Sequence, residues 1–492
     1  MVNEIHDLII ENKDTYKNVT KFEEIDNQNE LKFGKRDVDI KYATDYGDSN
    51  YIYPIGSIYD NTILYAYLST KLIKSIEKMP CVTDIIKDKV LKKTSYYNEI
   101  DIQQQAQWDG LEIQNNAPNH LSVISQGKYR GDLINKYDTN YYYPESAGKN
   151  VDIFILDGGF NFNYEEYKSN GRTTKCDIAV INGRIINKTT SDVPNLCNLD
   201  PEKVHGILVS AVAGGSKNGV AKKANIHGIN LNNITYSNVF TALIYIKNHL
   251  KKSHRTVFNM SFGDFYTIHE RNEKHILFTQ RLINDMSEEG SIFVASAGNH
   301  GRNVHETEEL EKFHLPCILD NVICVGGIDN NVYESTSGMY RLHEKSNYGK
   351  EVNIYAPFKA YISAIYNYGE KEEKTHSGTS LSTPMVAGVI ALIMGENPNT
   401  VYTYETMVEK LQTMGEKGII SGISDDSPNY FVNNGKRIVY SKDGQYEGKC
   451  GIYAGNQKCP SGECCSFDSY CTTSKKACKI INDCQPNYGK CN

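Results

Sequence analysis

The 492-residue sequence has little proline, one tryptophan and no long apolar run. Glycine (38) and proline (13) together make up about a tenth of the chain, which excludes collagen-like and low-complexity proteins. The longest apolar run, residues 385–394, is ten residues long and too short to span a bilayer. No basic block occurs and the net charge is −7, which argues against nucleic acid as the main partner. With 39% hydrophobic and 23% charged residues, the composition is that of an ordinary soluble globular protein.

Cysteine is scarce except at the end of the chain, where eight of the 13 cysteines lie in the last 43 residues. A segment this short has too little apolar surface for a core and needs covalent or metal cross-links. Zinc is the alternative to disulfides, but this segment has no Cys-x-x-Cys pair, and the last histidine is His376. We therefore expect disulfides and an exported protein, extracellular or associated with a cell wall. No signal peptide is visible in this chain, because residues 1–7 show neither a basic start nor an apolar stretch.

A length of 492 residues predicts about three domains, and the composition changes along the chain to match. Residues 1–115 hold an apolar helical pattern at 72–79, ended by Pro80, and an expected edge strand at 82–90, which together predict a small α+β unit. Residues 116–440 alternate strand-like and helix-like segments, which predicts an α/β domain with a doubly wound, mostly parallel sheet. The polar stretch 441–448 is an expected linker, followed by the small disulfide-rich module 449–492. The expected strands of the large domain are 151–156, 256–260, 291–295 and 322–325, and its expected helices are 239–250, 274–287 and 383–394.

The segment with the clearest chemistry is 376–388, in which small residues form a tight turn that opens into a helix with Pro384 in its first turn. A serine at such a point, Ser380, has an exposed hydroxyl, and its backbone N–H lies among the unpaired donors of the helix start. These donors suit the oxyanion that forms when the hydroxyl attacks a carbonyl. The alternative is a small-residue helix packed against a neighbour. A lipase or esterase lacks support, because no Gly-x-Ser-x-Gly pattern surrounds Ser380.

Three other segments offer the partners that a serine nucleophile needs. Asp157 ends an expected buried strand, at the edge where open α/β sheets place their sites. His205 precedes an apolar helical run, and Asn299 follows another buried strand as a candidate second oxyanion donor. Each residue taken alone has an ordinary explanation: an Asx turn for Asp157, a helix-start histidine for His205 and a chain turn for Asn299.

Together these segments resemble the subtilisin-like serine proteases, most closely their proteinase-K-like branch, over residues 120–440. The order Asp157, His205, Ser380 is the subtilisin order. The resemblance implies that Asp157 orients the imidazole, His205 is the general base and acid, Ser380 is the nucleophile and Asn299 donates to the oxyanion. It also implies that a strand at 259–263 pairs with the substrate backbone through Ser261, Phe262 and Gly263.

Two motifs depart from the family pattern. Gly158 stands where a hydroxyl residue is usual, and Gly206-Ile207-Leu208 stands where Gly-Thr-His is usual. Neither departure replaces a member of the expected triad, so they bear on rate and local geometry rather than on the type of reaction. A degraded, inactive copy is the alternative.

Residues 65–90 are similar to the carboxyl half of the inhibitory propeptide of this family, which assists folding and blocks the site until it is removed. An unrelated α+β domain is the alternative. Cys81 lies in this part of the chain. Removal of the propeptide would therefore leave an even number of cysteines in the rest of the protein. Cys176 with Cys197, and Cys317 with Cys324, are possible local pairs.

The last segment resembles the hevein-type chitin-binding module, although eight cysteines by themselves allow 105 pairings. The resemblance implies the pairs 450–465, 459–471, 464–478 and 484–491, with Ser466 and Tyr470 as chitin-binding residues. Asp468 and Ala477 occupy positions where the family carries aromatic residues, and Phe467 is out of register. We therefore expect weak chitin binding. The cysteines concerned are Cys450, Cys459, Cys464, Cys465, Cys471, Cys478, Cys484 and Cys491.

The leading hypothesis is a secreted serine endopeptidase, made as a self-processed zymogen, that acts on proteins or peptides and is inhibited by its own propeptide. Its tail is expected to bind chitin or related N-acetylglucosamine polymers weakly. No cofactor is expected, and no metal ligands are assigned, because calcium ligands in this family are scattered along the chain. The alternative hypothesis is a carbohydrate-binding protein whose protease body is inactive.

Overall fold

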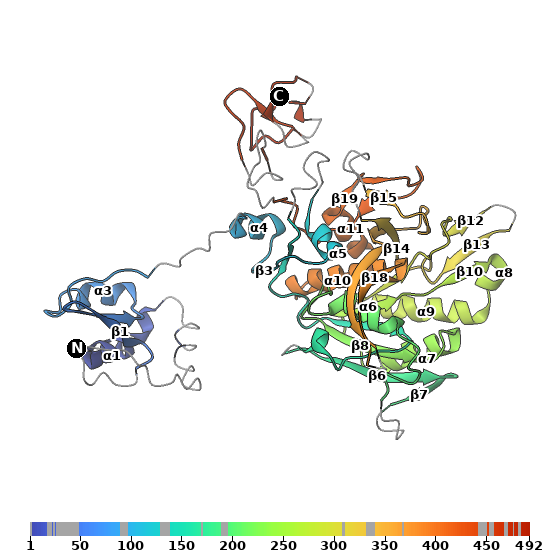
Figure 1. Ribbon diagram of the computed structural model, residues 1–492, viewed down its shortest axis with the longest axis horizontal. Helices are drawn as coiled ribbons and strands as arrows, with labels where there is room; N and C mark the ends of the chain where they lie inside the picture. The colour runs from blue at the N-terminus through green and yellow to red at the C-terminus, as the bar shows by residue number, and fades with distance from the viewer. Residues whose placement is uncertain are drawn as a thin grey trace. The chain divides into compact units, whose positions relative to one another are not determined.

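The computed structural model divides into two compact units, Met1–Thr94 and Ser95–Asn492 (Figure 1). The boundary at Thr94 precedes the expected end of the first domain at residue 115, and the expected linker 441–448 lies outside the described residues. The structure describes residues 2–16, 22, 25, 49–88, 97–127, 138–168, 171–187, 195–307, 310–330, 340–366, 369–440, 450–451, 457–466, 471–475, 477–480 and 484–492.

The first unit is a small α+β fold. Its elements are α1 (Val2–Glu11), η1 (Lys13–Thr15), β1 (Ile52–Ile58), β2 (Asn61–Ala66) and α3 (Thr70–Ile76). β1 and β2 form an antiparallel hairpin, and the apolar sides of α1 and α3 pack with it into one core. The helix expected at 72–79 is thus present as α3.

The edge strand expected at 82–90 is wrong over its described part, because residues 82–88 form no strand. Val82 and Ile85 pack, partly buried, against the apolar core of the unit, whereas Ile86 is exposed. The apolar residues of this segment therefore serve packing against the core rather than strand pairing, which β-propensity alone does not distinguish.

The second unit is built on one large sheet. Its described strands follow the order β19-β21-β16-β14-β11-β9-β5-β8-β6-β7, with β15 and β20 beside this path. The centre from β16 to β6 is parallel. At the periphery, β7 pairs antiparallel with β6, β15 with β14 and β19 with β21. This arrangement confirms the predicted parallel α/β sheet. The strands are β5 (Asp152–Asp157), β6 (Thr174–Ile181), β7 (Arg184–Ile186), β8 (Asn225–Leu231), β9 (Thr256–Met260), β11 (Ser291–Ser296), β14 (Val322–Asp329), β15 (Tyr340–Leu342), β16 (Ile354–Pro357), β19 (Glu416–Lys417), β20 (Ile420–Ser421) and β21 (Tyr430–Phe431).

Helices pack against this sheet in two groups. α6 (His205–Gly214) and α10 (Thr379–Glu396) contact each other and the central strands, whereas α7 (Tyr236–His249) and α9 (Lys274–Glu288) contact each other. α10 is long and apolar enough to cross a membrane, but 83% of its apolar window is buried inside the fold, so it is the core helix. The other helices of this unit are α4 (Glu99–Ala106), α5 (Asn119–Ser122), η3 (Val123–Ser125), η5 (Glu165–Tyr167), α8 (Ile268–Arg271) and α11 (Tyr404–Met414).

Smaller sheets surround the large one. β17 (Lys359–Ile365) and β18 (Lys371–Ser377) form a hairpin whose second strand leads directly into α10. β10 (Asp264–Thr267), β13 (Lys312–Leu315) and β12 (His305–Glu306) form a three-stranded sheet that begins shortly after β9. The remaining pairs are β3 (Leu111–Gln114) with β4 (Tyr141–Pro144), and β22 (Cys464–Cys465) with β23 (Cys471–Thr472).

Six disulfides cross-link the second unit, and Cys81 of the first unit is a free, exposed cysteine. In the tail they join 450 to 465, 459 to 471, 464 to 478 and 484 to 491, the pairs that the hevein-type resemblance implies. In the body they join 176 to 197 and 317 to 324. The sulfur atoms of Cys450, Cys459 and Cys465 lie within 4.8 Å of one another, but all three are in disulfides and offer no thiolate to a metal.

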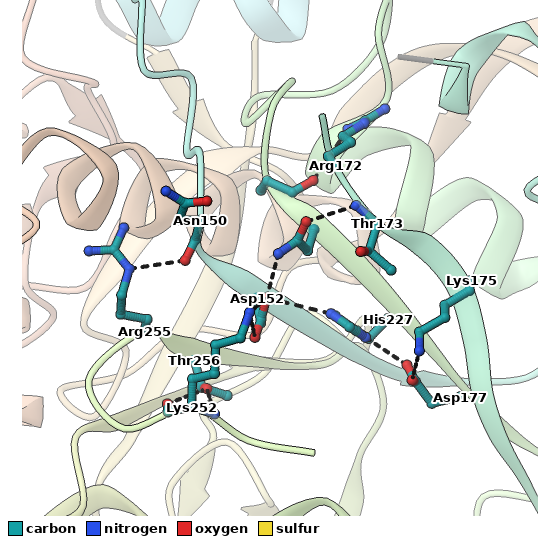
Figure 2. Close-up of polar contacts among 12 residues, drawn as sticks. Asn150, Asp152, Arg172, Thr173, Lys175, Asp177, His227, Lys252, Arg255 and Thr256 are labelled. Atoms are coloured by element: carbon teal, nitrogen blue, oxygen red, sulfur yellow. Dashed lines mark hydrogen bonds and ion pairs between the residues drawn. The ribbon is translucent and has the colours of Figure 1, made fainter. Parts of the chain in front are cut away.

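A buried charge cluster lies at the start of β5, at the end of that strand opposite Asp157 (Figure 2). His227 on β8 stands between two carboxylates, with its Nδ1 2.6 Å from Asp177 and its Nε2 3.5 Å from Asp152. Lys175 and Lys252 each approach one of these carboxylates, at 2.9 and 3.0 Å. Because both aspartates are almost fully buried, the imidazolium between them holds three strands together.

This cluster gives stability a defined pH range. Burial acts to lower the pKa of His227, but hydrogen bonds and charges from Asp152 and Asp177 outweigh it and raise that pKa above 6.5. Burial acts to raise the pKa of both aspartates, but the interactions with His227, together with Asn225 and Lys252 at Asp152 and with Lys175 at Asp177, outweigh it and lower each pKa below 3.8. The histidine contribution is complete below pH 6.5 and is lost as the pH rises through its raised pKa. The aspartate contribution is complete above pH 3.8 and is lost as the pH falls through the lowered values.

Replacement His227→Leu is expected to destabilise the second unit by about 3–5 kcal/mol, because it leaves two buried carboxylates without the imidazolium. Urea unfolding at pH 5.5 measures the change, with His249→Leu, an exposed histidine on α7, as the control. The control is expected to stay within about 0.5 kcal/mol of the native chain. Equal stability of His227→Leu and the native chain would contradict the stabilising role of His227 in the buried charge cluster.

Candidate active site

Asp157 and His205 are brought together by a close approach of two backbone segments. Asp157 is the last residue of β5, His205 is the first residue of α6, and the Gly206 N–H donates to the Gly158 carbonyl at 3.1 Å. A Cβ on Gly206 would lie 2.6 Å from the carbonyl oxygen of Gly159, so only glycine permits this approach. The contact between the two segments therefore depends on glycine at position 206.

The two side chains form a charge-assisted pair. His205 Nδ1 lies 2.9 Å from Asp157 Oδ1 and 2.8 Å from Oδ2, and Oδ1 also accepts the N–H of Gly158 at 2.7 Å. The carboxylate is buried, whereas the imidazole is about half exposed (45%). The charge of Asp157 raises the pKa of His205, and burial opposes it. The carboxylate therefore fixes the ring and stabilises its protonated form, while Nε2 stays available.

Ser380 is the second residue of α10, which begins at Thr379. The residue before the helix, Gly378, has a positive φ. Its hydroxyl donates to the Ser261 carbonyl at 3.3 Å, and the Ser261 hydroxyl donates to the Ser380 carbonyl at 2.9 Å. This exchange ties the start of α10 to the residue that follows β9. The Ser380 hydroxyl donates here to Ser261 rather than to His205, and bonds between nucleophile and base often form only when substrate is bound. α6 and α10 pack against each other and begin at His205 and Thr379.

Asn299 presents its amide nitrogen beside the backbone N–H of Ser380. Its Oδ1 accepts both the N–H and the hydroxyl of Thr379, each at 2.9 Å, which assigns the two ends of the amide and leaves Nδ2 free to donate. A Cβ built on Gly378 would lie 3.4 Å from Asn299 Nδ2 and 3.7 Å from the Ser380 nitrogen. Both N–H donors therefore border one space next to the serine, an arrangement that suits an oxyanion.

The three expected substrate-binding residues directly follow β9. Ser261 is buried against Ser380, Phe262 is partly buried, and a Cβ on Gly263 would lie 2.7 Å from the Leu315 carbonyl oxygen. Of the expected chitin-binding residues, Ser466 is buried, with its carbonyl accepting from Gln485 Nε2 at 3.0 Å, and Tyr470 lies outside the described residues.

Sequence reasoning missed two histidines near this site. His376 on β18 is close enough to His205 to feel its charge: burial lowers the pKa of His376, Glu372 opposes this, and Lys374 and His205 add to the lowering. His314 lies on β13 beside Gly263 and Gly298. The signal for His376 was its place in the segment 376–388 that carries Ser380, which we call the serine motif, whereas β13 carries no motif that would single out His314.

The family model of subtilases matches residues 148–426, which is more than half of the chain. The chain belongs to the subtilase family. It is a subtilisin-like serine endopeptidase with proteins or peptides as substrates. The matched range contains Asp157, His205, Asn299 and Ser380.

Curated relatives of this subtilase share about a quarter of its residues. Subtilisin-like protease 2 of Trichophyton equinum is 25% identical over 388 residues, which are 77% of each chain. The subtilase-type proteinase RRT12 of Saccharomyces cerevisiae is 25% identical over 406 residues, 75% of this chain and 72% of its own. Among solved structures, that of a cold adapted subtilisin-like serine proteinase covers 65% of this chain and 98% of its own, with 23% identity and a TM-score of 0.48.

Proposed function

We propose that this subtilase cleaves peptide bonds with Ser380 as nucleophile, His205 as general base and acid, and Asp157 as the residue that orients the imidazole. The observation that carries the proposal is the pair of N–H donors, Asn299 Nδ2 and the Ser380 backbone, which border one space at Gly378. The Asp157–His205 pair supports it, because such a base needs a fixed ring with one free nitrogen. The active-site serine is tested by covalent labelling with a fluorophosphonate.

In the proposed reaction, the Ser380 oxygen attacks the peptide carbonyl carbon while His205 Nε2 takes the hydroxyl proton. The carbonyl oxygen becomes an oxyanion and accepts from Asn299 Nδ2 and the Ser380 N–H. Collapse breaks the C–N bond, and the imidazolium gives its proton to the leaving amine, which leaves an acyl ester on Ser380. Water, deprotonated by His205, then hydrolyses this ester and restores the serine.

Activity is expected to rise with pH, because His205 must be neutral to accept the serine proton. The charge of Asp157 raises the pKa of His205 above its ordinary value of 6.5, against the effect of burial, so the half-maximal rate should lie above pH 6.5. The measurement is kcat/KM for a peptide substrate from about pH 4 to 9 in buffers of constant ionic strength. A rate that does not change over this range would remove histidine base catalysis from the proposal.

We also propose that the first unit is an inhibitory propeptide, which the enzyme removes by cutting the chain between the two units. Its hairpin exposes several large apolar side chains, and such surfaces on a small unit indicate that it binds another surface. The body of the same chain is the partner that we infer. The exposed residues are Ile55, Ile58, Tyr59 and Ile63.

For the tail, we propose a four-disulfide module that binds chitin weakly, in an oxidising, extracellular setting that suits the chain's six disulfides. Stacking on an aromatic ring contributes about 1–3 kcal/mol for nucleic-acid bases, and sugar stacking is of comparable order or weaker. With Asp468 and Ala477 at two of the three aromatic positions, only Tyr470 supplies a platform in register.

Retention of the chain on chitin beads tests this proposal. The full chain carrying Ser380→Ala, which prevents self-digestion, is expected to be retarded weakly, and adding Tyr470→Ala should abolish the retardation. Ser474→Ala, in the same module, serves as the matched control. Tight retention that survives Tyr470→Ala would show that another surface binds the polymer.

A further inference from the structure

A buried asparagine on β8, Asn230, lies next to Asp157 in the large sheet. β5 and β8 are parallel, and their register pairs Asp157 with Asn230. Asn230 is 2% exposed, and a buried amide needs hydrogen-bond partners for both its oxygen and its nitrogen. Because Asn230 stands beside the proposed catalytic pair, the partners of its amide bear on the geometry of that pair.

The oxygen of this amide binds the turn that follows Asp157. Gly159, the second residue of that turn, donates its N–H to Asn230 Oδ1 at 3.2 Å. The N–H of the preceding residue, Gly158, donates to Asp157 Oδ1 at 2.7 Å. The two successive N–H groups are thus accepted by two side chains that lie side by side on β5 and β8. Asn230 therefore holds the backbone directly after the carboxylate.

The nitrogen of the same amide binds the segment that precedes His205. Asn230 Nδ2 donates to the Leu196 carbonyl at 2.8 Å. The two bonds assign the ends of the amide, because a backbone N–H needs the oxygen and a carbonyl needs the nitrogen. One side chain thus connects the segment after Asp157 with the segment before His205.

The two segments also contact each other directly. Phe160 donates its N–H to the Cys197 carbonyl at 2.9 Å, and a Cβ on Gly159 would collide with the Lys203 carbonyl oxygen. A disulfide joins Cys197 to β6. Since β8 lies between β5 and β6, the amide of Asn230 reaches both segments from the strand between their anchors. A change at this amide therefore acts on the spacing of the two segments.

We propose that Asn230 is a positioning residue, which keeps Asp157 and His205 in hydrogen-bonding geometry through the two backbone segments. This inference rests on the function proposed above. Without the amide, the buried N–H of Gly159 and the buried carbonyl of Leu196 lose their partner, which costs stability unless the segments shift to find others. A displacement of about 1 Å can cost about 10²-fold in rate, so a small movement of the imidazole is enough.

Asn230→Ala is expected to lower kcat for a p-nitroanilide peptide about tenfold or more with little change in KM, because the pair acts on the reaction and not on binding. The rise of kcat/KM with pH should also move to lower pH. The charge of Asp157 raises the pKa of His205 and burial opposes it, so a looser pair leaves the effect of burial larger. His376 on β18, which interacts electrostatically with His205, is unchanged in this variant.

Asn230→Thr keeps the test informative if Asn230→Ala does not fold. Threonine suits a strand and retains a hydroxyl for one of the two bonds, so its kcat should lie between those of the native enzyme and Asn230→Ala. Asn225→Ala is the matched control. Asn225 begins the same strand, and its amide also makes two bonds, from the Thr173 N–H at 2.8 Å and to Asp152 at 2.6 Å. This variant should lower the melting temperature but keep the native kcat and pH dependence.

Native kcat and an unshifted pH dependence in the folded Asn230 variants would overturn the inference and leave the proposed function standing. An equal loss of kcat in Asn225→Ala would overturn it as well, because the effect would then come from general loosening of β8. Failure of the native enzyme to cleave any peptide or to react with a fluorophosphonate would overturn both the inference and the proposed function.

Discussion

Replacement Ser380→Ala is expected to abolish peptide hydrolysis and to leave the first unit attached to the chain. The members of such a triad act as a unit, and removal of the serine costs subtilisin about 10⁴–10⁶-fold in rate, the range expected here. Self-cleavage between the two units should stop for the same reason. The fold should remain, because the Ser380 hydroxyl makes only a long bond of 3.3 Å to the Ser261 carbonyl.

Casein hydrolysis measures the activity, fluorophosphonate labelling measures the nucleophile, and the mass of the purified chain reports removal of the first unit. Ser377→Ala, an exposed serine three residues earlier, is the matched control and should stay active, labelled and processed. Casein cleavage by Ser380→Ala at the native rate would rule out Ser380 as the nucleophile. A native chain without labelling or hydrolysis would favour the inactive scaffold with a carbohydrate-binding tail.

Replacement Asn299→Ala is expected to lower kcat by about 10²–10³-fold with little change in KM, the loss known for removal of one oxyanion donor in subtilisin. Its Nδ2 is positioned for the oxyanion, which forms only after attack, so substrate binding should not need it. The bonds from Thr379 to Asn299 Oδ1, both 2.9 Å, show that the other end of the amide is structural.

Asn299→Asp separates these two functions of the side chain. It keeps an oxygen that accepts from Thr379 and replaces only the donor, so its melting temperature should stay closer to the native value than that of Asn299→Ala. Its kcat should fall at least as far, because a carboxylate repels the oxyanion. Steady-state kinetics with a p-nitroanilide peptide and thermal unfolding measure both effects. Native kcat in Asn299→Asp would exclude the amide as a donor.

Local patterns in the sequence predicted the main elements of the large domain, because burial makes those segments nearly continuous in apolar residues. The strand expected at 256–260 is β9, the helix expected at 274–287 is α9, and α10 starts four residues before the expected 383. The serine motif could be recognised because its small residues and helix start are contiguous. The hevein-type spacing likewise implied the four tail pairs that the structure forms.

Contacts between distant segments depended on the tertiary structure. The pairing of His205 with Asp157 joins residues 48 apart in the sequence. It depends on the close approach of Gly206 to the carbonyl oxygen of Gly159, which a side chain at position 206 would block. The orientation of the Asn299 amide likewise depends on Thr379, which lies 80 residues away.

By itself, the amino-acid sequence determined where the main strands and helices of the large domain and the Ser380 segment occur, because periodicity and turn chemistry act between neighbours along the chain. The tertiary structure alone decided which polar groups meet. It placed His227 between Asp152 and Asp177, set His314 between two glycines and left residues 82–88 without a strand partner. Burial and close approach across the sheet select these contacts, and neither leaves a periodic signal in a single segment.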